Sequence, residues 1–500
     1  MAGIGLENLG SLHTLVFSSL EFLVRYLPLF LLLFFLTPGR YRNYVLFAYS
    51  IILYGLGEPK YVLVLLGMCM VNFLFGKYLE PERVSEYMQG HREEGRRKLW
   101  LGVGIACNAG LLLYFKVSNA FDANFLLPMG ISFYTFKSIS YLIDVYRADT
   151  EAETSFVRFG AYLCCFPQVV SGPIMRYPDA VQGLKRGKLS YARLEDGLRM
   201  LVAGLAMKVL LADRLGILWN DIQTIGVESI STPLAWLGAF GYSMQLYFDF
   251  AGYSLMAVGI GVMIGLPRIK NFDQPYSSRS VSEFYRRWHM TLGSWFRDYL
   301  YIPLGGNRKG AVRKELNLLI VFAVSGLWHG GAPTFLVWGL GHGIWIVLEE
   351  LWRRAKRRLF GEKKPVKALP LAWACRIASA VLTFFGVCCL WIFFRSETLH
   401  MAFVCLKNLF TGWAGFAYAE DFIFAMGLEK AEMLIAVFAA AVLLLLDLVS
   451  EIKKEETAVW IYRAALPVRW AVCLFLIGMI FVTGMYGKGF DPSSFIYVSF

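Results

Sequence analysis

Long apolar runs recur along the chain and are separated by short polar stretches. About 20 apolar residues form a helix long enough to cross the roughly 30 Å hydrocarbon layer of a bilayer. Candidate runs lie at 19–36, 43–57, 60–79, 99–116, 125–146, 197–221, 232–265, 372–394, 431–450 and 467–486. The pattern predicts an all-α polytopic membrane protein with about 10–12 transmembrane helices.

Two further apolar stretches, 157–175 and 315–351, are interrupted by helix breakers. The first contains Phe166-Pro167, and the second contains Gly330-Gly331-Ala332-Pro333. Lys and Arg collect in cytoplasmic loops of membrane proteins. The basic segments of this chain are 83–98, 176–199, 268–314 and 353–367. All four can be cytoplasmic only if both interrupted stretches enter and leave on that face, so we predict that both are re-entrant.

The amino-acid composition indicates that part of the protein surface contacts lipid rather than water. Hydrophobic residues make up 57% of the chain and charged residues only 17%, against roughly 25% charged in soluble domains. The net charge of +12 is then explained by cytoplasmic loops, without a nucleic-acid partner. The longest polar stretches, 80–98 and 176–197, are too short to fold alone. We therefore expect a single membrane domain over 1–500, whose motif-rich part spans about 125–351.

His329 lies where the second interrupted stretch is broken, within Ser325–Pro333. If the chain enters the membrane near Glu315, the residues before His329 rise about 21 Å, less than the hydrocarbon thickness. Broken backbone at that depth needs surrounding protein or a watery cavity. An ionisable group there is a candidate functional residue, and burial favours the neutral imidazole that accepts a proton. A structural histidine between helices is the alternative.

A second histidine, His289, lies in a segment that is too charged to span and too aromatic for a plain loop. Residues 283–301 predict an amphipathic helix along the cytoplasmic face, with its Trp and Tyr rings at headgroup depth. His289 is then either functional or an exposed interfacial anchor. His342, within the apolar Leu340–Gly343, is expected to pack against a neighbouring helix.

Two charged residues fall inside apolar runs, namely Lys208 and Asp249. They can pair with each other or line one cavity, and the sequence leaves both possibilities open. The nine cysteines show no CxxC or Cys/His spacing, so no metal site and no disulfide framework is expected. No GxSxG elbow or phosphate-binding loop is present, which argues against a serine enzyme and an ATP-driven pump.

Several motifs together resemble the membrane-bound O-acyltransferase family. They are Trp288-His289, the run Trp295–Arg308, Ser325–Gly330, Pro128–Phe136, and Phe166-Pro167-Gln168 through Ile174. The resemblance covers roughly residues 13–360. It is strongest to the bacterial branch, which includes the alginate O-acetyltransferase membrane subunit and the D-alanyl transfer protein of teichoic acid synthesis. The full run Trp295–Arg308 resembles the acetyltransferase members more than the D-alanyl members.

The resemblance implies a ring of helices around a funnel in a bacterial cytoplasmic membrane, with re-entrant and interfacial helices and a tunnel to the catalytic histidine. By residue, His329 matches the membrane histidine of the family and His289 its second catalytic position. The implied donor is a cytoplasmic acyl thioester, acetyl-coenzyme A. The implied acceptor is an extracytoplasmic polysaccharide or a partner acetyltransferase. Neither a bound cofactor nor a metal is expected.

The chemistry suits these residues. His329 can act as general base on the acceptor hydroxyl, and His289 can orient the donor or polarise its carbonyl. The Nε1–H of Trp328 can stabilise the developing oxyanion. Trp328, Arg297 and Asn307 are the candidates for contact with the donor. A polysaccharide or lipid flippase, or a scaffold that recruits an extracellular transferase, remains as an alternative function.

Overall fold

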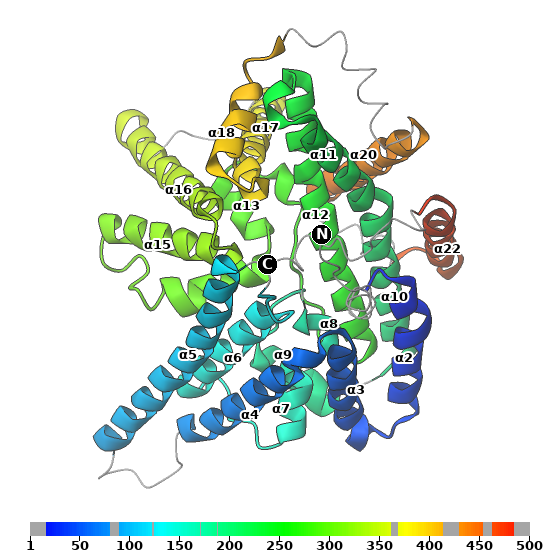
Figure 1. Cartoon of the computed structure of the whole chain (residues 1–500), viewed down its shortest axis with the longest axis vertical. Helices are drawn as coiled ribbons and strands as arrows, with labels where there is room; N and C mark the ends of the chain where they lie inside the picture. The colour runs from blue at the N-terminus through cyan, green and yellow to red at the C-terminus, as the bar shows by residue number, and fades with distance from the viewer. Residues whose placement is uncertain are drawn as a thin grey trace. The chain divides into compact units, whose positions relative to one another are not determined.

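The computed structural model (Figure 1) describes residues 17–80, 90–122, 125–170, 172–187, 189–361, 369–413, 430–453 and 463–484. Every regular element within these ranges is a helix, which confirms the predicted all-α class. The chain forms two compact units. The first takes its described residues from Met1–Leu205 and Tyr253–Ile269, and the second from Ala206–Gly252 and Lys270–Tyr486.

The first unit contains the early helices of the chain, in which η marks a short 3-10 or π-helix. They are η2 (Phe22–Tyr26), α2 (Leu27–Leu36), η3 (Gly39–Tyr41), α3 (Arg42–Gly57), η4 (Pro59–Tyr61), α4 (Val62–Leu79), α5 (Gly90–Phe121), α6 (Ile131–Tyr146), α7 (Phe156–Leu163), α8 (Phe166–Val169), α9 (Tyr177–Arg186) and most of α10 (Tyr191–Ala206). Helices α4 and α5 are joined by a buried amide pair, because Asn72 and Asn108 each donate to the other's Oδ1, at 3.0 and 2.7 Å.

The second unit contains η5 (Met207–Ala212), α11 (Asp213–Ile225), η6 (Val227–Ser229), η7 (Pro275–Ser277), α13 (Val281–Arg287), α14 (Met290–Phe296), η8 (Arg297–Tyr301), α15 (Ala311–His329), α16 (Pro333–Phe360), α17 (Leu369–Arg395), α18 (Leu399–Asn408), α20 (Lys430–Lys453) and α22 (Leu466–Thr483). Helix α12 (Thr232–Met263) begins in this unit, and its residues from Tyr253 onward belong to the first.

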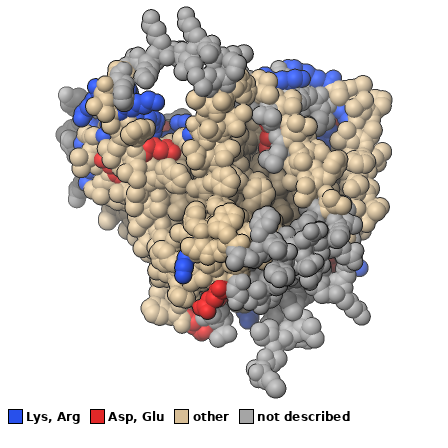
Figure 2. Space-filling model, turned by 90° about the horizontal axis from the view of Figure 1, so that it is seen from above, with Lys and Arg blue, Asp and Glu red and all other residues tan. Residues whose placement is uncertain are grey.

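Five of the described helices are long and apolar enough to cross a membrane. They are Pro59–Leu79, Glu94–Phe121, Thr232–Met263, Trp373–Arg395 and Leu466–Thr483. Many large apolar side chains on the described helices face outward, such as Leu63 and Leu382, as expected where lipid is the solvent. In Figure 2, much of the described surface carries neither Lys and Arg nor Asp and Glu. The chain is a multi-pass membrane protein.

Both interrupted stretches are broken where the sequence predicted. In the first, α7 ends at Leu163 and α8 begins at Phe166. In the second, α15 ends at His329 and α16 begins at Pro333. The run 197–221 departs from expectation, because it divides into α10, a π-helical turn and α11. Single π-helical turns within α-helices occur frequently at functional sites.

Candidate functional site

Helices α15 and α16 form a hairpin that carries His329 at its tip. Figure 1 shows the two helices side by side. Small residues allow this close approach, since a Cβ on Gly326 would collide with the carbonyl oxygen of Phe335. A Cβ on Gly339 would likewise collide with the carbonyl oxygen of Phe322. The close packing of the two helices therefore fixes the end of α15 relative to α16, and with it the position of His329.

The open end of the hairpin is joined by ion pairs. Lys314 Nζ lies 2.6 Å from Glu350 Oε2, and Arg354 lies 2.7 Å from Glu315 and 2.8 Å from Glu350. Because Lys314 and Glu315 stand near the start of α15 and Glu350 and Arg354 near the end of α16, the chain returns to the side from which it came. This is the turn that the sequence predicted. Its cytoplasmic orientation stays a prediction.

The imidazole of His329 is 3% exposed and lies among aromatic rings from three helices. Its ring centroid is 4.4 Å from that of Trp328 on α15, 5.1 Å from that of Trp338 on α16 and 5.0 Å from that of Phe394 on α17, all with the planes steeply inclined. Such edge-to-face contacts restrict the orientation of a ring. The catalytic candidate is thus held in a low-dielectric aromatic pocket at the end of a helix.

His289 is also buried, which corrects one expectation from the sequence. Residues 283–301 form α13, α14 and η8 rather than one surface helix, and His289 at the α13–α14 junction is 2% exposed. Its φ of 42° is positive, which is uncommon outside glycine and is found more often for Asn, Asp and His. Rings of Phe250 and Phe272 pack against the imidazole, with centroids 4.7 and 6.4 Å away.

A single amide holds His289 from one side. Asn271 Oδ1 lies 3.0 Å from His289 Nδ1. The same oxygen accepts from the backbone N–H of Thr291 at 3.3 Å and from its hydroxyl at 2.8 Å. Burial lowers the pKa of His289 to about 3, so its imidazole is neutral at physiological pH. No sequence signal singled out Asn271, because a lone asparagine in an irregular segment has no distinctive spacing.

The two candidate histidines border one continuous group of rings, which we call the aromatic cluster: Trp288, Trp338, Trp391 and Phe394. Trp391 on α17 lies 5.1 Å from Trp288 and 5.5 Å from Trp338, measured between ring centroids. Phe272 connects His289 to this cluster, because its ring centroid is 6.4 Å from that of His289 and 5.1 Å from that of Trp288, and Trp338 contacts His329. The structure therefore brings both motifs to one aromatic cluster, and it adds α17, which the sequence had not assigned to the site.

His342 packs against this cluster, as expected. Its Nδ1 lies 3.0 Å from the carbonyl oxygen of Trp338 one turn earlier, and its ring centroid is 5.2 Å from that of Tyr285. Because a carbonyl oxygen only accepts, Nδ1 is the donor. A backbone contact within its own helix is typical of a structural histidine.

The buried charges Lys208 and Asp249 pair with each other. Lys208 Nζ lies 2.8 Å from Asp249 Oδ1, and Asp213, which the sequence analysis missed, lies 2.6 Å from the same nitrogen. All three side chains are less than a tenth exposed. Buried charges persist in proteins where they are paired in this way. The group connects η5, α11 and α12.

The candidates for donor contact divide by exposure. Arg297 is 64% exposed and pairs with Asp298, Nε to Oδ1 at 2.7 Å, and Asn307 is also exposed. Trp328 is buried against His329. Arg297 and Asn307 therefore lie at the protein surface, whereas Trp328 belongs to the buried part of the site.

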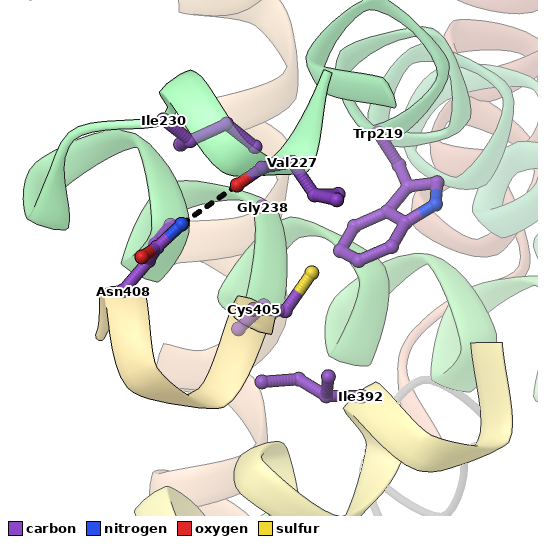
Figure 3. A pocket seen from close by; sticks show the side chains of 9 residues that line it. Trp219, Val227, Ile230, Gly238, Ile392, Cys405 and Asn408 are labelled. Carbon is purple, nitrogen blue, oxygen red and sulfur yellow. Dashed lines mark hydrogen bonds between the residues drawn. The ribbon is translucent and has the colours of Figure 1, made fainter. Parts of the chain in front are cut away.

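Two cavities lie apart from these residues. One, shown in Figure 3, is lined by Trp219, Ile392, Cys405 and their neighbours, and its volume of about 10 Å³ holds about one water. Asn408 closes one edge by donating to the Val227 carbonyl oxygen at 2.7 Å (dashed line in Figure 3). Another cavity, of about 250 Å³ in the first unit, is lined by residues such as Arg42 and Lys185. Neither is lined by a candidate histidine.

Comparison with known proteins decides the family. Residues 147–393 match the model of the membrane-bound O-acyltransferase family, a range that contains both histidine motifs. A probable alginate O-acetylase (AlgI) of Pseudomonas putida is 38% identical over 405 residues, covering 78% of this chain and 79% of the relative. The chain belongs to the membrane-bound O-acyltransferase family.

More distant members of the family resemble the chain over much of its length. A peptidoglycan O-acetyltransferase of Helicobacter pylori is 30% identical over 440 residues, covering 79% of this chain and 80% of the relative. A teichoic acid D-alanyltransferase of Bacillus subtilis is 27% identical over 288 residues, covering 55% and 71%. These comparisons confirm the family resemblance found in the sequence motifs and identify the chain as an acyltransferase of the membrane.

Proposed function

We propose that this membrane O-acyltransferase moves an acetyl group from a cytoplasmic thioester, acetyl-coenzyme A, to a hydroxyl on the other side of a bacterial cytoplasmic membrane. The acceptor is a polysaccharide or the hydroxyl of a partner transferase. Relatives named for O-acetylation of alginate and peptidoglycan support the acetyl donor and the polysaccharide acceptor. Family membership favours this enzyme over the flippase or scaffold that the sequence left open.

In the proposed reaction, His329 takes the proton of the acceptor hydroxyl while the hydroxyl oxygen attacks the thioester carbonyl carbon. The carbon–sulfur bond then breaks, and the proton passes from His329 to the departing thiolate. The indole N–H of Trp328, adjacent to His329, suits the role of donor to the developing oxyanion. The exposed Arg297 and Asn307 suit contact with the soluble donor, since an arginine binds phosphate well.

The observation that carries the proposal is that both motif histidines are buried at the same aromatic cluster. His329 is enclosed by the rings of Trp328, Trp338 and Phe394, which restrict the orientation of its imidazole. A general base needs such a fixed position within reach of the proton that it takes. A purely structural role would leave unexplained why both buried histidines lie in the segments that carry the family motifs.

The proposal is tested by the fate of labelled acetate. Cells that produce the protein are grown with radiolabelled acetate, and the surface polysaccharide is compared with that of cells lacking the protein and of cells producing the His329→Gln variant. We expect label in the polymer only with the wild-type protein. Equal labelling in all three strains would contradict the proposal. Purified protein in nanodiscs with labelled acetyl-coenzyme A then tests whether this thioester is the donor.

A further inference from the structure

The hydrogen bonds around Asn271 determine which nitrogen of His289 carries its proton. Thr291 contributes a backbone N–H to Asn271 at 3.3 Å, and a backbone N–H can only donate. The side-chain atom of Asn271 at this point must therefore be the oxygen, because the amide nitrogen would present a second donor. The same oxygen lies 3.0 Å from His289 Nδ1. Two acceptors cannot share a hydrogen bond, so Nδ1 carries the proton.

We infer that Asn271 is a positioning residue that fixes His289 as the Nδ1–H tautomer, so that Nε2 presents a lone pair toward the reacting groups. The catalytic part of this inference rests on the proposed function. The tautomer itself follows from the contacts of Asn271 and is independent of the proposed function.

The segment around Asn271 is anchored so that its side chain keeps this place. The backbone carbonyl of Asn271 accepts from the N–H of Met290 at 2.8 Å, and Asp273 N–H donates to the carbonyl of Arg287 at 2.9 Å. These two bonds align the segment after α12 with the α13–α14 junction. The positive φ of His289, of the kind that concentrates at functional sites, lies within this alignment.

The sequence allowed His289 to orient the donor or to polarise its carbonyl, and the tautomer argues against the second role and favours a contact with the acceptor instead. Polarising a thioester carbonyl needs an N–H donor at Nε2, which the neutral Nδ1–H tautomer lacks. A lone pair at Nε2 instead accepts a hydrogen bond from a hydroxyl. His289 therefore orients the acceptor hydroxyl, or relays its proton, and does not polarise the donor carbonyl.

The charged groups on the elements around His289 are three ion pairs and the carboxyl of Asp447 on α20, which interacts electrostatically with Asp273 and Lys270. Lys270 pairs with Asp273 on the segment of Asn271, Arg287 pairs with Glu283 on α13, and Lys208 pairs with Asp249 beside Phe250 on α12. Replacing Asn271 by aspartate thus adds one carboxylate next to the imidazole and keeps the acceptor oxygen. A carboxylate stabilises the protonated imidazole and raises the pKa of His289.

The direct test is the protonation of the two ring nitrogens. Wild-type protein labelled with ¹⁵N-histidine in lipid is measured by solid-state NMR at pH 7, with the His289 signals assigned by their loss in His289→Gln. We expect a protonated Nδ1 and an unprotonated Nε2. A protonated Nε2 would overturn the inference, whatever the enzymatic activity proves to be.

The catalytic consequence is tested by the pH dependence of transfer. Asn271→Asp should keep activity within about tenfold of wild type at pH 8. As the pH is lowered, this variant should lose activity at a higher pH than wild type does, because its Nε2 becomes protonated sooner. Asn271→Leu should lower kcat about 10²-fold or more, since the wrong tautomer of a catalytic histidine is costly. Thr291→Val keeps the backbone N–H and should leave the pH profile unchanged.

Three results would overturn the positioning role while leaving the proposed acyl transfer intact. They are an Asn271→Asp profile that coincides with that of wild type, an Asn271→Leu variant with wild-type kcat, and a Thr291→Val profile that shifts like that of Asn271→Asp. Loss of transfer in wild-type protein under all conditions would instead count against the proposed function.

Discussion

The two histidine-bearing regions of the second unit hold their imidazoles by different means. The α15–α16 hairpin positions His329 through close helix packing and aromatic walls. The segment of 271–301 positions His289 through the amide of Asn271 and a backbone alignment. Ring packing fixes the place and plane of an imidazole, whereas a hydrogen bond at Nδ1 also fixes which nitrogen bears the proton. We therefore expect the hairpin to be sensitive to added bulk and the segment of 271–301 to be sensitive to pH.

The hairpin should depend strongly on its small residues. Gly326→Ala introduces a Cβ that collides with the backbone of Phe335, so we expect a destabilisation of about 1–3 kcal/mol and a marked loss of transfer. Thermal unfolding of the purified protein measures the first effect. Gly102→Ala on α5 is the matched control, because its Cβ would meet no atom within 4 Å. Equal melting temperatures for the two variants would show that close packing does not hold the hairpin.

The burial of His289 should instead make the stability of the protein depend on pH. The pKa of His289 is about 3 in the folded protein and about 6.5 when unfolded. Between these values the unfolded chain binds a proton that the folded protein does not, so stability falls as pH falls below 6.5, by about 1.4 kcal/mol per pH unit. Melting temperatures between pH 7.5 and 5 measure this. His289→Gln should show a shallower decline, and identical slopes would mean that His289 is not buried in its neutral form.

A smaller effect is expected at the contact that joins the two regions. Glu349 on α16 accepts from the backbone N–H groups of Val281 and Ser282 at the start of α13, at 2.7 and 3.3 Å. Glu349→Ala removes this cap and should cost about 1 kcal/mol, as the loss of a helix cap does. Hydrogen exchange should speed up in α13 while α15 keeps its protection. The exposed Glu397 provides the control substitution, Glu397→Ala, and acceleration in both helices would indicate that the regions are not separable.

The hydrophobic pattern predicted much of the fold because the thickness of the hydrocarbon layer sets the length of a membrane-spanning helix. The breaks at Phe166-Pro167 and Gly330–Pro333 were predictable, since a proline interrupts a continuous helix but fits the first turn of a new one. Pairing of Lys208 with Asp249 was one of two possibilities, and a buried charge needs a partner. Here local chemistry restricts the outcome to few structures.

Tertiary contacts account for what the sequence missed. The burial of His289 depends on Phe250 and Asn271, which are remote from it along the chain, and its positive φ leaves no periodic signature. Trp391 and Phe394 lie beyond the motif-rich part of about 125–351, and only folding brings α17 against the hairpin. The role of Asn271 is evident only from the three hydrogen bonds that its side-chain oxygen accepts in the folded structure.

The central claim is that His329 is the base of the reaction, and two matched substitutions test it directly. His329 and His342 are both buried and both contact Trp338, but His342 has the backbone bond of a structural residue. Transfer of labelled acetyl groups by purified His329→Gln and His342→Gln is measured per mole of folded protein. We expect His329→Gln to lose about 10²–10⁴-fold and His342→Gln to stay within about tenfold of wild type. Retention of more than about a tenth of wild-type transfer by His329→Gln would contradict the account.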